Sequence, residues 1–75
     1  MSATRPAVPA GPVCAAPAGF APERVRAEIL AVAMAGIEMG EHDRRVAAWL
    51  AGWDAATVVT VASWIARARE AGPLW

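Results

Sequence analysis

The side chains that could support nucleophilic or acid–base chemistry are few and widely separated in this chain. Ser2, Cys14, His42 and Ser63 are the candidates for a nucleophile or a base, and no spacing links them. Covalent catalysis needs a nucleophile in contact with a base, which a third group orients. The chain also has neither a glycine-rich phosphate loop nor a dinucleotide-binding fingerprint. We therefore expect no enzymatic activity, no cofactor and no small-molecule substrate.

Metal binding is equally weakly supported. Glu38 and His42 stand four residues apart and Asp43 follows, but Gly40 is expected to break the helix between them. Three oxygen and nitrogen ligands without further His or Cys make a poor site. We interpret this stretch as a solvated turn and expect no metal.

The remaining possibility is binding chemistry, and it depends on the elements that position the side chains. Residues 1–21 contain four prolines, which remove backbone donors and fix φ. We expect a disordered Pro/Ala-rich arm there and a three-helix domain over 22–75. The first helix should begin at Pro22, run to Met39 and end at Gly40. Its predicted apolar face includes Val25 and Ile29, together with Val32, Gly36 and Met39.

Two shorter-range signals place the other helices. Asp43 is the expected N-cap of a helix over 44–51, which Gly52 ends. Asp54 is the expected N-cap of a helix that continues to about Ala71, before Gly72-Pro73. The sequence thus predicts an all-α fold, a small three-helix bundle. Since so short a chain rarely builds a core worth more than ~3–5 kcal/mol, we expect self-association or a partner protein to add buried area.

The segment from Arg44 to Ser63 resembles the helix-turn-helix superfamily. The positions that carry the resemblance are a small residue, a turn glycine, an apolar residue and two buried positions: Ala48, Gly52, Trp53, Val58 and Val61. This register turns Ala47 and Ala51 inward and leaves Val46, Trp49 and Leu50 pointing away. A second register, with a turn one residue longer, packs the large residues inward. It is similar to the first two helices of the three-helix unit in response-regulator and sigma-factor tails.

The resemblance implies a small DNA-binding transcriptional regulator, which is our alternative hypothesis. The side chains that would contact DNA are Arg44, Arg45, Thr60, Ser63, Arg67 and Arg69. Base edges are best recognised by Arg, Lys, Asn or Gln, and none of these lies on the expected groove-facing side of residues 54–63. With seven Arg against seven acidic residues, the net charge is also zero, so no electrostatic preference for nucleic acid follows.

Our first hypothesis is a non-catalytic module that binds protein, including a copy of itself. A smooth face of small side chains on the third helix would make the contact, with the terminal tryptophan as an anchor: Ala56, Val59, Thr60, Ser63 and Trp75. Trp49, Trp53 and Trp64 are expected to fill the core. No apolar run reaches the ~18–20 residues that span a bilayer, and a single cysteine permits no internal disulfide. We expect a cytoplasmic protein.

Overall fold

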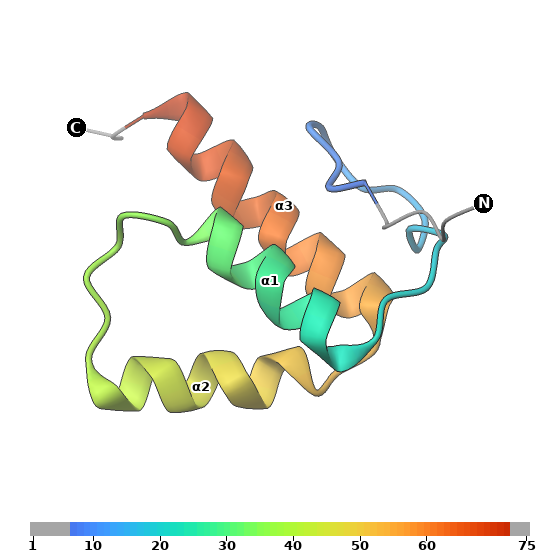
Figure 1. Cartoon of the computed structure of the whole chain (residues 1–75). Helices are drawn as coiled ribbons and strands as arrows, with labels where there is room; N and C mark the ends of the chain where they lie inside the picture. Colours follow the sequence, from blue (N-terminus) through green and yellow to red (C-terminus); the bar gives the residue numbers. More distant parts are fainter. Residues whose placement is uncertain (1–6, 73–75) are drawn as a thin grey trace.

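The described part of the chain is helical throughout its second half. The computed structural model describes residues 7–72, and within them it contains three helices and no strand. The helices are α1 (Glu23–Ala33), α2 (Glu41–Ala51) and α3 (Ala55–Ala71), drawn in Figure 1. This confirms the all-α prediction. Residues 7–22 have no regular secondary structure.

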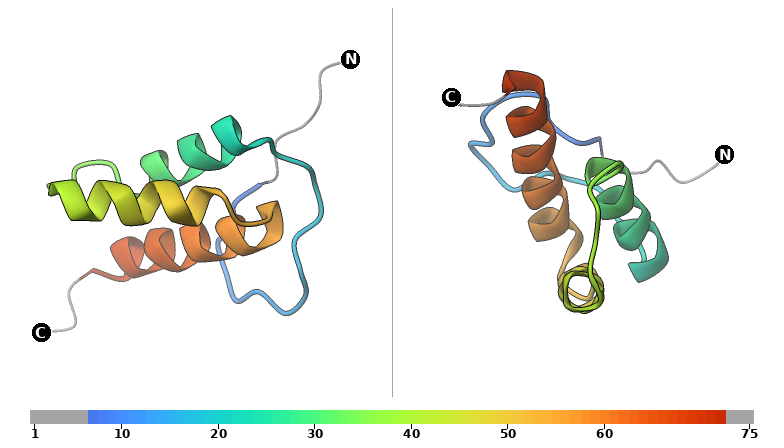
Figure 2. Two further views of the ribbon diagram at one scale, coloured as in Figure 1. Left: turned by 90° about the horizontal axis from the view of Figure 1, so that it is seen from below. Right: turned by 90° about the vertical axis from the view of Figure 1, so that its left-hand side faces the viewer.

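Helix α1 is the central element, because it packs against both α2 and α3. Helix α2 crosses the other two at a steep angle, and the right-hand view of Figure 2 looks along its axis. Two small clusters of buried residues form the core, one centred on Ile29, Val59 and Ala62 and the other on Leu30, Ala51 and Val58. Helix α2 contacts α1 more than it contacts α3, and a helix-turn-helix pairing of α2 with α3 is not confirmed.

Helix α1 ends six residues earlier than predicted. Its last residue is Ala33, and a turn and an extended segment follow before α2. Gly36 lies in this turn with a φ of +86°, a backbone conformation that residues with a Cβ rarely adopt. It does not lie on a helix face, so its predicted place on the apolar face of the first helix is wrong. Arg69 of α3 donates from Nη1 to the Ala33 carbonyl at 2.8 Å and so satisfies a terminal acceptor of α1.

Helix α2 begins earlier than predicted. Gly40 is its N-cap and Glu41 its first residue, so Asp43 is not the N-cap but the third helical residue. The Asp43 carboxylate accepts a hydrogen bond from the Gly40 N–H at 2.9 Å. A carboxylate at this position can reach back to the N-cap amide, as in one half of a capping box. The residue type was therefore interpreted correctly as a helix-start signal, but its position was wrong.

Helix α3 has the predicted bounds. The Asp54 carboxylate accepts from the backbone N–H of Thr57 at 3.0 Å and from its hydroxyl at 2.8 Å. The helix ends at Ala71, and Gly72 follows with a φ of +77°. Both signals are local, so the sequence was sufficient to place them.

One arginine joins three parts of the fold. Arg26 of α1 donates from Nε to the Ala51 carbonyl at 2.7 Å and from Nη1 to the Ala21 carbonyl at 2.6 Å. Ala51 is the last residue of α2, whose terminal carbonyls have no partner within the helix and favour a cation. Arg26 therefore fixes the end of α2 and the last part of the irregular segment to α1.

The segment over residues 7–20, which we call the arm, returns across α3 instead of extending away from the helices (Figure 2). Its Pro9 carbonyl accepts a hydrogen bond from the hydroxyl of Ser63, 54 residues away in sequence. Ala21, at the junction with α1, is buried. The arm is irregular, as its prolines predict, but its first described residues are held against the helices.

Candidate interaction surfaces

The outer side of α2 and the turn that follows it present large apolar side chains to solvent. Trp49 is 64% exposed and Trp53 is 48% exposed, and Val46, one turn before Trp49, is also exposed. The two indole rings contact each other edge to face, with ring centroids 5.6 Å apart and an interplanar angle of 81°. No charged residue occurs between Val46 and Trp53. We call these three residues the tryptophan face.

The prediction that the tryptophans fill the core is wrong. Trp64 of α3 is 58% exposed, in addition to the two on the tryptophan face. The core positions of α2 and α3 are taken by smaller residues such as Ala51, Val58 and Ala62. Three positions on α2 agree with the first helix-turn-helix register: Val46 and Trp49 point outward and Ala51 is buried. Two others do not agree with it, because Leu50 is half-buried and Ala48 is exposed. Trp75 lies outside the described residues.

The small-residue face of α3 is not open to solvent. Val59 and Ser63 are fully buried, and Ala56 and Thr60 are half-buried. Val59 packs in the core with Ile29 of α1. The Thr60 hydroxyl donates to the Ala56 carbonyl within the helix at 2.8 Å. In this conformation, Val59 and Ser63 have no surface with which to meet a partner.

Ser63 is the central polar group of this covered face. Its hydroxyl donates to the Pro9 carbonyl at 2.7 Å. The Arg67 Nε, one turn further along α3, donates to the Ser63 hydroxyl oxygen at 3.1 Å. The buried hydroxyl thus has both an acceptor and a donor partner, as a polar group removed from water requires. The arm, α3 and one guanidinium form a continuous hydrogen-bonded contact.

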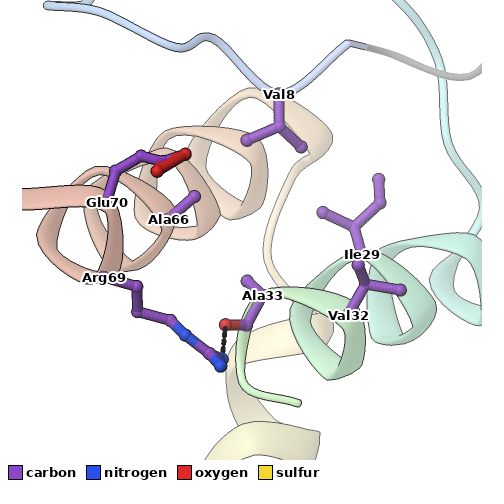
Figure 3. Close-up of a pocket in the computed structure, with 7 residues that line it drawn as sticks. All are labelled: Val8, Ile29, Val32, Ala33, Ala66, Arg69 and Glu70. Carbon is purple, nitrogen blue, oxygen red and sulfur yellow. Dashed lines mark hydrogen bonds between the residues drawn. The ribbon is translucent and has the colours of Figure 1, made fainter.

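The arm leaves unfilled space where it crosses the helices. A cavity of about 370 Å³ lies between Val8, the end of α1 and the last turns of α3. Figure 3 shows the side chains that line it. It is lined by Val8, Ile29, Val32, Ala33, Ala66, Arg69 and Glu70. A smaller space of about 190 Å³ is lined by residues 8–10 of the arm and by Ala66, Arg67 and Glu70 of α3. The bond from Arg69 to the Ala33 carbonyl holds the two helices together at the rim (Figure 3).

A second groove lies between α1 and α2, with a volume of about 360 Å³. Its lining is almost wholly apolar and includes Leu30, Met34 and Met39. Arg44 is the one charged residue that lines it. Both helices also contribute small alanine side chains to its lining.

The residues predicted to contact DNA do not form one surface. Arg44 and Arg45 are exposed on α2, where Arg45 is paired with Glu41 at 2.9 Å. On α3, Ser63 is buried, and Arg67 and Arg69 donate to acceptors within the chain. DNA binding stays a prediction, and in this conformation the arginines of α3 are already engaged.

The residues considered for catalysis and metal binding are dispersed. Cys14 is an exposed free thiol, His42 is exposed on α2, and the Ser63 hydroxyl is committed to the arm. Ser2 lies outside the described residues. Over residues 7–72, no group of three or more His, Cys, Asp or Glu side chains could hold a metal ion. Within the same range, no helix has the length and apolar character needed to cross a membrane.

The N-cap carboxylate of α3, Asp54, has a lowered pKa. The hydrogen bond from the Thr57 hydroxyl, reinforced by the Thr57 backbone N–H, holds the pKa of Asp54 below its ordinary value of 3.8. The carboxylate is exposed and belongs to a helix cap, so we assign it a structural and not a catalytic part.

No family model, curated protein or solved structure matches this chain. The surfaces must therefore be interpreted from their own chemistry. Sequence reasoning missed two of their features, the contact of Val8 and Pro9 with α3 and the exposure of the tryptophans. The sequence position of Ser63 gave a partial signal, because a hydroxyl among the small side chains of one helix face needs a hydrogen-bond partner once that face is covered.

Proposed function

We propose that this chain is a non-catalytic helical module that binds protein, and that a second copy of the chain is one of its partners. The tryptophan face makes the contact in this proposal, in place of the small-residue face of α3. The observation that carries it is the pair Trp49 and Trp53, which lie in contact with each other and remain about half exposed or more.

Two aromatic rings in contact form a preorganised apolar surface. Tryptophan is the residue type most enriched among those that dominate the free energy of protein association, since a single indole buries a large apolar area. Val46 and Trp49 have the i, i+3 spacing by which a helix lies in an apolar groove, and Trp53 extends this surface just beyond the end of α2. These features favour a helical or grooved protein surface as the partner.

The preference for a second copy rests on the small core and on the charge. The largest fully buried side chains in the described residues are Leu30, Val58, Val59 and Ser63. A domain of this size gains much of its stability from additional contacts when its own core is small. The net charge of zero means that two copies do not repel each other at long range.

The test is the mass of the full chain in solution as a function of concentration. By light scattering, the wild type is expected to exceed the monomer mass of 7.8 kDa at high concentration. Replacing both Trp49 and Trp53 by Ala should return it to the monomer, with the helical circular dichroism retained.

The matched control is Trp64→Ala, which removes an indole of similar exposure from α3. It should leave the concentration dependence unchanged. A wild type that stays monomeric at millimolar concentration would contradict self-association. A double tryptophan variant that associates as the wild type does would contradict the assignment to α2.

A further inference from the structure

The arm contact has the chemistry of peptide recognition, although both sides belong to one chain. Residues 8–10 lie against α3, with the Val8 side chain at the cavity and the Pro9 carbonyl on the Ser63 hydroxyl. The hydroxyl is fully buried, yet it is aimed at a backbone carbonyl of an irregular segment. A contact of this kind recognises the backbone of the ligand and tolerates changes in its side chains.

Proline makes such a segment a favourable ligand. A chain that contains proline is already extended before it binds, so it loses little conformational entropy in an apolar groove. The three prolines of the arm, at 9, 12 and 17, are consistent with that state. The side-chain specificity then depends on the residue directly before Pro9, which is Val8.

Val8 does not fill the space available to it. The cavity beside it measures about 370 Å³, and Val8 itself is still 38% exposed. The lining of this cavity is aliphatic at Ile29, Val32, Ala33 and Ala66, and Arg69 and Glu70 lie at its rim. A larger aliphatic or aromatic side chain before the proline would bury more apolar surface there.

We propose that this groove between α1 and α3 is a binding site for an extended segment of a partner protein that carries a large apolar residue directly before a proline. Residues 8–10 occupy the site in the absence of that partner. The site is separate from the tryptophan face on α2, so its test is independent of the proposed self-association.

The arm competes with any partner because it is tethered. A short flexible tether gives an effective concentration on the order of millimolar, so a weak external peptide is excluded while the arm is seated. Releasing the arm should therefore increase the apparent affinity for a peptide added in trans. Val8→Asp places a charge against the apolar cavity and should release it without altering the helices.

The experiment uses the full chain and fluorescently labelled hexapeptides. The peptides are Ala-Val-Pro-Ala-Gly-Pro, which copies residues 7–12, and the same sequence with Leu or Ala in place of Val. Binding to the Val8→Asp variant is expected to be at least tenfold tighter than binding to the wild type. The extra methylene of Leu should improve affinity over Val by roughly threefold to fourfold.

Three controls make the result specific. Ser63→Ala in the Val8→Asp background should weaken binding about fivefold, because it removes the hydrogen bond to the peptide carbonyl. Ala16→Asp, an exposed arm residue that lines neither cavity, should leave wild-type behaviour unchanged. The Trp49→Ala and Trp53→Ala double variant should bind the peptides as its parent does.

A parallel measurement needs no substitution. In the wild type, saturating Leu peptide should shift the amide NMR signals of Ser63 and Ala66, while those of α2 stay in place. Equal affinity of the wild type and Val8→Asp, full affinity without the Ser63 hydroxyl, or no preference for Leu over Ala would each overturn the proposal.

Discussion

Exposure to solvent on the outer face of α2 and on the small-residue face of α3 is the reverse of what side-chain size predicts. On α2 and just after it, the large residues Trp49 and Trp53 are exposed, while Ala51 is buried. On α3 the small residues Val59 and Ser63 are buried, since α1 and the arm cover them. Burial in this chain is therefore decided by which elements come close together, and small side chains permit the closest approach.

The largest expected effect on stability comes from placing one carboxylate on each of these two faces. Val59→Glu places an unpaired carboxylate in the core and should cost more than ~4 kcal/mol, which exceeds what so small a domain can lose. Trp49→Glu changes an exposed residue and should cost about 1 kcal/mol or less, part of it from the contact with Trp53. Far-ultraviolet circular dichroism and thermal melting separate the two.

Retention of the helical spectrum in Val59→Glu would show that the α3 face is open in solution. In that case the small-residue face would again be the better candidate for self-association. Loss of the spectrum in Trp49→Glu would show instead that the tryptophan face is part of the core.

An intermediate effect is expected at the arginine that holds α2 in place. Arg26→Met removes the bonds to the carbonyls of Ala51 and Ala21 and should lower the free energy of unfolding by about 2–3 kcal/mol. Arg24→Met is the matched control, because Arg24 is exposed and forms an exposed pair with Glu28 at 3.8 Å. Its effect should stay within ~0.5 kcal/mol. Urea denaturation measures both, and equal losses would contradict the assignment to Arg26.

The smallest effect concerns the cap of α3 and depends on pH. Because the pKa of Asp54 is lowered on folding, the cap stabilises the fold above the ordinary value of 3.8 and loses this effect as pH falls through the lowered pKa. Asp54→Ala should lower the melting temperature by a few degrees at neutral pH. The difference from the wild type should shrink in acid.

Asp54→Asn serves as the control for this titration. Asparagine keeps the capping geometry but has no proton to gain, so its melting temperature should stay near that of the wild type at neutral pH. A difference between wild type and Asp54→Ala that is constant from neutral pH to pH 3 would contradict the pKa assignment.

The parts of the fold that the sequence predicted are those that local signals determine. Asp54 and Gly72 mark the ends of α3, because each acts on residues within one turn. The end of α1 could not be predicted in the same way. Arg69, 36 residues further along the chain, satisfies the Ala33 carbonyl there, and no local pattern encodes that contact.

The candidate surfaces were predicted less well for a related reason. The α3 face of small residues was predicted to contact a second copy or another protein, but in the structure α1 and the arm of the same molecule cover Val59 and Ser63. Pro9 and Ser63 are 54 residues apart, and neither residue type specifies the other. The tryptophans were misplaced because a large apolar area favours the core and a binding surface equally.

The bond from Arg26 to the Ala21 carbonyl sets a boundary to any motion of the arm. Residues beyond this anchor can detach and return as a local event, since neither core cluster contains a residue of the arm. The Ala21 carbonyl, held by Arg26, is then the hinge about which the arm moves, and the three helices stay packed together. Hydrogen exchange should accordingly be fast at residues 10–20 and slow from α1 onward.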